Sequence, residues 1–309
     1  MLLIFLSWIY IFITATNFGI LFTKLLKIER CNLIIQQILG LFFYTIITSF
    51  FAFFIRINIE YYILILFLNI FITYFYRKSI FKYLSALFLA FKTLKFGYKS
   101  LYLFLFFILL AQSSTKPYLI DNESYYIQTI KWINEYGFVK GLANVHMFLG
   151  QNSSWHTLQA GFNFPFFADF YNDINGYLFV IFGFLAIKKL NDYNAKKNIQ
   201  NLNLGLVLLF SLFLMQFINA PSPDLITFLV TPYIFYVFIL KYDNITINNF
   251  KIHLKKGYYE IYISYSKEYG VVSTTFQKKI KKEHIVLLLD MASYLEALLL
   301  NNGTEIIND

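Results

Sequence analysis

The chain has 309 residues, of which 58% are hydrophobic, 21% are aromatic and only 14% are charged, and its formal net charge is +9. This composition excludes an ordinary soluble domain and indicates a membrane protein, because so few polar side chains cannot cover a water-exposed surface. Cys31 is the only cysteine, which excludes an intramolecular disulfide framework and a cysteine-based zinc site.

Apolar runs along the chain predict about seven transmembrane helices. Each such helix needs roughly 20 predominantly apolar residues, or fewer where flanking lysines reach back to the interface. The first run has no basic region before it, so we interpret it as a retained span rather than a cleaved signal peptide. We expect the fourth run to extend back past Lys99, the fifth to extend toward Phe170, and the seventh to accommodate Pro232. The predicted spans are 2–22, 33–55, 61–76, 101–112, 174–187, 204–218 and 225–240.

Lysine and arginine concentrate in three loops that fall on one side of these spans, at 24–30, 77–99 and 188–197. Short loops rich in Lys and Arg stay in the cytoplasm, so the net charge is a topology signal and does not indicate nucleic-acid binding. The N-terminus and residues 113–173 are then predicted to lie outside. Basic and apolar residues mix between 79 and 96, which is typical of a helix at the cytoplasmic interface or of an extension of the fourth span.

The outer segment is predicted to contain three short amphipathic helices. Asp121 stands where a helix N-cap is expected, and Gly137 is a natural C-cap for that first helix. A second helix is expected over Leu142–Leu149, and Ser153 or Ser154 is expected to cap a third. The predicted apolar face of the first helix consists of Tyr126, Ile127, Ile130, Ile133 and Tyr136. These helices would form a lid or platform over the mouth of the bundle.

The fold class predicted is therefore an all-α polytopic membrane protein that ends in a small α+β cytoplasmic tail. In that tail, a Y-Y-E-I-Y-I-S-Y run alternates like a strand, and Glu283–Leu300 is predicted to be a helix. The predicted domains are N-terminal spans (1–112), an extracytoplasmic helical loop (113–173), C-terminal spans (174–240) and the tail (241–309).

Three motifs of the chain resemble those of a family of multi-spanning bacterial membrane proteins. They are D-N-E-S-Y-Y-I-Q-T-I-K-W-I-N-E-Y-G-F-V-K-G-L-A-N-V-H from residue 121, the following L-G-Q-N-S-S-W, and A-P-S-P-D at 220–224. That family is similar in layout to the GT-C glycosyltransferases, which take a sugar from a polyprenyl-phosphate carrier and place a catalytic acid at the start of an outer loop. Asp121 matches that acid, although Asn122, Glu123 and Ser124 stand where a turn containing glycine is common.

The same segment contains side chains that suit sugar transfer. Asp121 or Glu123 could take the proton of the acceptor, and Asp224 could bind the acceptor or a metal. Trp132 or Trp155 could stack on a sugar ring. Asn152 of the N-S-S-W box is a further candidate for binding the substrate. The groups that could meet the departing phosphate are His146, His156, Lys116, Lys131 and Lys140.

Each of these residues also has a purely structural interpretation. Asp121 and Asp224 could act as helix caps, Glu123 could be a first-turn acid, the histidines could be interfacial, and the tryptophans could be headgroup anchors. No sequence signal indicates a cofactor or a bound divalent metal. The partners expected are membrane lipid, a polyprenyl-linked sugar donor and a glycan or lipid acceptor. The alternative function is a non-catalytic protein for transport or assembly of surface polysaccharide, located like the enzyme in the bacterial cytoplasmic membrane with its C-terminus inside.

Overall fold

The computed structural model divides the chain into two compact units, residues 1–233 and 234–309. The residues whose structure is described are 1–28, 31–116, 120–150, 153–167, 173–242, 246–255, 258–267 and 270–278.

Five helices of the first unit are long and apolar enough to cross a membrane, which makes the chain a multi-pass membrane protein by length and composition. Many of their large apolar side chains point out of the unit, as helices surrounded by lipid require; Phe67, for example, is 66% exposed. These five helices are α1 (Leu2–Leu25), α2 (Leu33–Ala52), α3 (Ile59–Lys92), α4 (Phe96–Ser113) and α8 (Asp173–Lys196).

The last two predicted spans correspond to shorter apolar helices. The sixth falls on α9 (Ile199–Phe210) and the 3-10 helix η3 (Ser211–Phe217), and the seventh falls on α10 (Asp224–Tyr242), which contains Pro232. Five spans are therefore present by length, and a total of seven stays a prediction.

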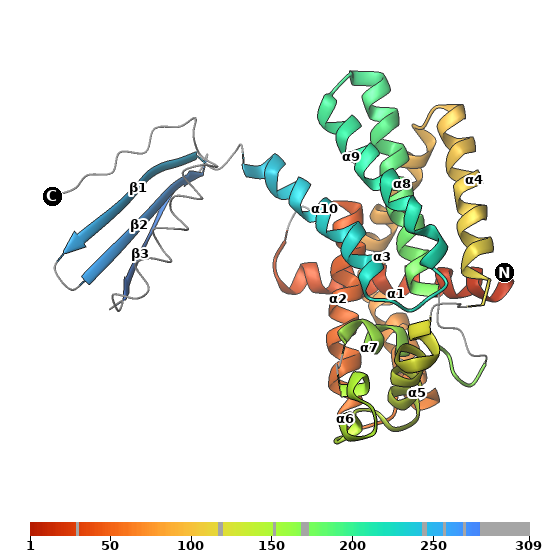
Figure 1. The fold of residues 1–309 in the computed structure, drawn as a ribbon. Coiled ribbons are helices and arrows are strands. Elements are labelled where there is room, and N and C mark those ends of the chain that lie inside the picture. Colours follow the sequence, from red (N-terminus) through yellow and green to blue (C-terminus); the bar gives the residue numbers. More distant parts are fainter. Residues whose placement is uncertain are drawn as a thin grey trace. The chain divides into compact units, whose positions relative to one another are not determined.

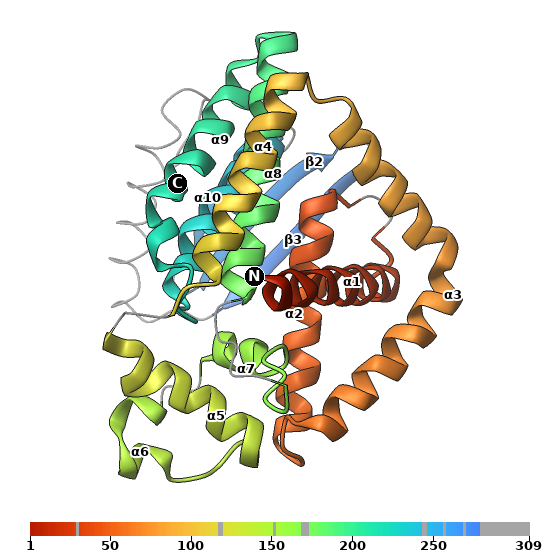
Figure 2. The same cartoon turned by 90° about the vertical axis from the view of Figure 1, so that its right-hand side faces the viewer.

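Two helices extend farther than their apolar runs. The third helix continues through the basic segment to Lys92, with a break in helical geometry at Tyr76 (φ −106°, ψ 18°), and Figure 2 shows α3 as bent. Residues 79–92 are thus the second half of α3, so their interpretation as an extension of the fourth span was wrong. The fifth helix extends at its C-terminal end to Lys196, and on that extension Lys188 pairs with Asp192 one turn later at 2.8 Å. Phe170, toward which we expected it to extend, lies outside the described residues.

The crossing of α1 and α2 depends on glycine. A side chain at Gly40 would overlap the carbonyl oxygen of Ala15, and a side chain at Gly19 would overlap that of Gln36. Small residues at such crossings let helix backbones approach closely, which is how helices associate without a hydrophobic driving force between them.

Amide side chains link the long helices in the interior. Asn17 of α1 donates to the side chains of Asn69 and Thr73 on α3, at 2.9 and 3.0 Å. Gln37 of α2 donates to Tyr83 at 2.9 Å and accepts a hydrogen bond from Tyr177 of α8 at 2.7 Å. Four helices are therefore joined by paired buried polar groups.

Between α4 and α8 lies a set of short helices, which we call the loop region (residues 120–167). They are η1 (Asn122–Tyr126), α5 (Ile127–Tyr136), α6 (Leu142–Val145), η2 (Met147–Gly150) and α7 (Ser154–Ala160). Figures 1 and 2 show α5, α6 and α7 gathered at one end of the unit, where α7 packs on α2 and α5.

Several predictions for the loop region hold and others do not. Gly137 ends α5 with a positive φ of 73°, and Ser153 caps α7 by accepting from the backbone of Trp155. The expected helix over 142–149 is instead two short turns that separate at His146, whose backbone is extended. Tyr136 was expected on the apolar face of α5 but is 61% exposed, because it lies in the last turn, beyond the residues that pack inward.

The second unit contains three antiparallel strands in the order β1, β2, β3 (Figure 1). Their bounds are Thr246–Lys255, Tyr258–Lys267 and Gly270–Lys278. In the register of β1 and β2, Ile252 stands opposite Ile261. The alternating run Y-Y-E-I-Y-I-S-Y lies in β2. The predicted helix 283–300 lies outside the described residues, and the cytoplasmic placement of the tail stays a prediction.

Candidate functional site

The first residues of the loop region form a π-helix, η1, in which the backbone N–H of Ile127 donates to the carbonyl oxygen of Asn122. Such helices are rare, and they occur frequently at functional sites. Asp121 precedes η1 with helical dihedral angles (φ −67°, ψ −21°) and its side chain makes no capping hydrogen bond. Its predicted role as an N-cap was therefore wrong, because the chain enters helical conformation one residue earlier, at Ile120.

Asp121 and Asp224 are both within electrostatic reach of the Tyr125 hydroxyl. The pKa of this phenol is raised, first by burial, then by its hydrogen bond with Tyr126, and further by the carboxylates of Asp121 and Asp224. Tyr125 therefore stays protonated at neutral pH and can donate a hydrogen bond. Two acids that are far apart in the sequence thus both act on the pKa of one phenol.

Asp224 is held at the start of α10 by its neighbour Ser222. The Ser222 hydroxyl accepts a hydrogen bond from the backbone N–H of Asp224 at 3.3 Å and donates one to its carboxylate at 3.2 Å. Ser222 thus performs the capping role that was expected of Asp224, and Asp224 is the first residue of the helix. The Asp224 carboxylate is exposed and lies where the dipole of α10 stabilises negative charge.

Five rings form a continuous row beside these acids, which we call the ring row. Adjacent ring centroids are 5.5, 5.0, 4.4 and 5.1 Å apart in the order His146, Phe148, Tyr125, Tyr126, His156. The row brings together both predicted histidines, which lie on different short elements. His146 is at its exposed end and His156 is at its buried end.

His156 is 3% exposed, and burial lowers the pKa of its imidazole to about 4. The ring is therefore neutral at physiological pH. A neutral imidazole can accept or donate a hydrogen bond, but it offers no positive charge to a phosphate. Of the ways to meet the departing phosphate, His156 therefore retains hydrogen bonding and loses charge pairing.

Three buried polar groups near the ring row have unpartnered atoms within the part of the chain that the structure describes. They are both side-chain atoms of Asn122, the Nε1 of Trp155 and the Nε2 of His156. Asn122 is completely buried, four residues before Tyr126 in the same π-helix. A buried polar atom without a partner costs roughly 1–3 kcal/mol, so such groups are rare in native proteins.

The C-terminal end of α7, at Ala160 and Gly161, which we call the α7 exit, is held in place by hydrogen bonds from three other helices. Tyr44 of α2 and Tyr62 of α3 donate to the carbonyl oxygens of Gly161 and Ala160, each at 2.6 Å. The Asn134 side chain donates to Ala160 at 2.9 Å and to Ile57 at 2.7 Å. This turn therefore ties α2, α3, α5 and α7 together, which gives the site a rigid base.

The remaining predicted residues do not belong to the ring row. Glu123 is exposed, and no described hydrogen bond or ion pair joins it to Tyr125. Trp132 packs on Tyr136 at 5.1 Å in the second half of α5, and Lys131 beside it is half-buried. Asn152 lies outside the described residues.

Five residues of this site were not predicted from the sequence: Asn122, Tyr125, Tyr126, Phe148 and Ser222. The adjacent tyrosines among acids were a visible signal, but the helical pattern assigned Tyr126 only to an apolar face. Nothing local marks Asn122 as buried, because it stands between two exposed acids.

A family described as "Domain of unknown function (DUF8201)" matches residues 1–267, and the chain belongs to that family. No curated protein and no solved structure matches it. The matched region extends from α1 through β2, so the loop region and the first two strands are both part of what defines the family.

Proposed function

We propose that the protein is a GT-C-like membrane glycosyltransferase that transfers a sugar from a polyprenyl-phosphate carrier to a cell-surface glycan or lipid. The observation that carries this proposal is the ring row, in which Tyr125 lies four residues after Asp121 and has its pKa raised by the carboxylates of both Asp121 and Asp224. Paired acids next to an aromatic surface suit a carbohydrate acceptor, since carboxylates bind hydroxyl groups and ring faces pack against the apolar faces of sugars.

In the proposed reaction, an acceptor hydroxyl attacks the anomeric carbon of the donor sugar. Asp121 takes the proton of that hydroxyl while the new glycosidic bond forms. The bond from the anomeric carbon to the phosphate oxygen breaks, and the phosphate leaves with the bonding electrons. Asp224 orients the acceptor hydroxyl, and the protonated Tyr125 donates a hydrogen bond to the charge that develops on the leaving oxygen.

The proposal places the loop region outside the bacterial cytoplasmic membrane. It requires α9 with η3, and α10, to act as the sixth and seventh spans, which leaves the tail in the cytoplasm. Lysine and arginine in the loops at 24–30, 77–99 and 188–197 support this orientation.

The test is sugar transfer in reconstituted membranes from a panel of polyprenyl-phosphate sugars. Wild type should transfer at least one sugar, and Asp121→Asn should reduce the rate by about 100-fold or more, which is typical for the loss of a general base. Glu123→Gln is the matched control, because it removes an exposed charge two residues away, in the first turn of η1; it should retain nearly the wild-type rate.

Two results would contradict the proposal. Loss of transfer in Glu123→Gln but not in Asp121→Asn would move the base to Glu123 and refute the site described above. A wild-type protein that transfers no sugar from any donor, while remaining folded, would favour a non-catalytic role in transport or assembly of surface polysaccharide.

A further inference from the structure

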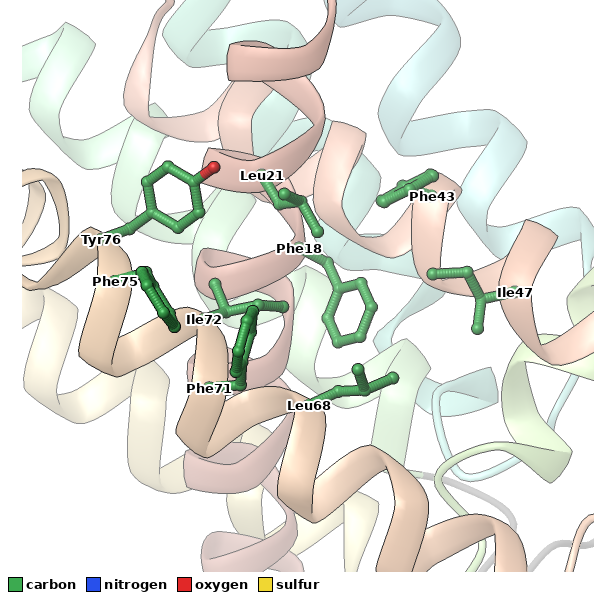
Figure 3. Close-up of a pocket in the computed structure, with 9 residues that line it drawn as sticks. All are labelled: Phe18, Leu21, Phe43, Ile47, Leu68, Phe71, Ile72, Phe75 and Tyr76. Carbon is green, nitrogen blue, oxygen red and sulfur yellow. The ribbon is translucent and has the colours of Figure 1, made fainter.

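An apolar cavity of about 440 Å³ lies between α1, α2 and α3, and none of its lining residues belongs to the ring row. Figure 3 shows side chains from the three helices pointing into it, and the hydroxyl of Tyr76 is the only polar side-chain atom among them. The lining includes Phe18 and Leu21 of α1, Phe43 and Ile47 of α2, and Leu68 and Tyr76 of α3.

The chemistry of this cavity suits a hydrocarbon chain. A cavity lined by aliphatic and aromatic side chains does not hold water well, but it binds apolar ligands. Its helices are candidate membrane spans, and Phe71 and Phe75 on its α3 wall are 59% and 62% exposed. Acyl chains of the bilayer therefore surround these helices and are the nearest apolar material.

One end of the cavity carries exposed positive charge. Tyr76 lines the cavity, and Arg77 and Lys78 follow it directly; Leu21 lines it from α1, with Lys24 one turn later. All three cations are exposed, and none forms an ion pair within the described residues. The helical geometry of α3 breaks at Tyr76, where the apolar wall meets the charged end.

We propose that this cavity is a binding site for an anionic phospholipid. One acyl chain lies between α1, α2 and α3, and the phosphate group meets Arg77, Lys78 and Lys24. A neutral lipid would fill the apolar part equally well, so the charges supply the selectivity for an anionic headgroup. This site does not depend on the proposed glycosyltransferase reaction, because it uses different residues.

The experiment measures binding of phosphatidylglycerol and phosphatidylcholine with identical acyl chains to the full chain, by native mass spectrometry from detergent. Wild type should bind one phosphatidylglycerol at least fivefold more tightly than phosphatidylcholine. Arg77→Gln/Lys78→Gln should lower that preference by about fivefold for each cation removed, down to no preference. Lys92→Gln/Lys95→Gln, which removes the same charge farther along, should leave the preference unchanged.

A second pair of variants tests the apolar part. Leu68→Trp should fill the cavity and weaken both lipids at least fivefold, whereas Leu103→Trp, on the exposed face of α4, should weaken neither. If Leu68→Trp fails to fold, phosphatidylglycerol with a photoreactive group in its acyl chain should label wild-type peptides that contain residues 68–76. Labelling spread evenly over all exposed spans, or equal loss of preference in Lys92→Gln/Lys95→Gln, would overturn the proposal.

Discussion

Asn17, in the interior of the helical bundle, donates to the side chains of Asn69 and Thr73, whereas neither side-chain atom of Asn122, in the loop region, is paired within the part of the chain that the structure describes. Both residues are almost completely buried. The bundle amides therefore hold helices together, as polar side chains do inside membranes. Among the described residues, no hydrogen bond gives the Asn122 amide such a linking role, and a buried amide beside the ring row is suited to bind a ligand.

The largest effect on stability is expected at Asn134. This residue belongs to the loop region, but its side chain is paired, as the bundle amides are. Its side chain makes two donated hydrogen bonds and accepts a third from Asn163 at 3.0 Å. Asn134→Leu should cost about 3 kcal/mol, roughly 1 kcal/mol for each bond lost, and lower the melting temperature in detergent by about 6–12 °C. Asn144→Leu, at an exposed asparagine, is the control. Equal melting temperatures for the two variants would show that Asn134 does not hold the α7 exit in place.

The second largest effect is expected at His156, in the pH dependence of the free energy of unfolding. Its folded pKa of about 4 lies below the ordinary value of about 6.5, so the unfolded chain binds more protons between these values. The contribution of this group to stability is complete above about pH 6.5 and is lost as the pH falls toward 4, by up to about 3 kcal/mol. His156→Gln should flatten this decline in melting temperature, and His146→Gln, at the exposed end of the ring row, should not. A decline of the same size in His156→Gln would contradict the buried neutral imidazole.

Asn122 gives the smallest expected effect on stability and the sharpest contrast with Asn17. Asn17→Leu should cost about 1–2 kcal/mol, because it removes the hydrogen bonds that the Asn17 amide donates to Asn69 and Thr73 of α3. Asn122→Leu should change stability by no more than about 0.5 kcal/mol, because no paired bond is lost. It should still lower sugar transfer at least tenfold. A stability loss in Asn122→Leu as large as that in Asn17→Leu would remove the distinction between the two regions.

The long helices could be predicted from the sequence because an uninterrupted apolar run of about 20 residues specifies a membrane helix without tertiary information. Their ends were less predictable. Lys188 and Lys189 mark the end of the apolar run, but α8 continues to Lys196 as a polar helix in which Lys188 pairs with Asp192. The break at Tyr76 contains neither proline nor glycine, so it leaves no local signal.

Only the residue types of the candidate site could be predicted from the sequence, and not their arrangement in space. Asp121, His146, His156 and Asp224 were identified by their chemistry, but their proximity depends on contacts between distant parts of the chain. The π-helix that begins after Asp121 has no sequence signature, so Asp121 was assigned a capping role that the structure contradicts. Asn134 was overlooked because an asparagine within an amphipathic helix gives no indication of the three partners it finds.

The most direct measurement is a double-mutant cycle on Asp121 and Asp224. Single-turnover sugar transfer would be measured for wild type, Asp121→Asn, Asp224→Asn and the double variant in the same reconstituted membranes. Substitutions of residues that act as one unit are strongly non-additive, so we expect the double variant to be no slower than the slower single variant. Losses that multiply in the double variant would mean that the two carboxylates act independently, and a wild type without transfer would contradict the enzymatic account itself.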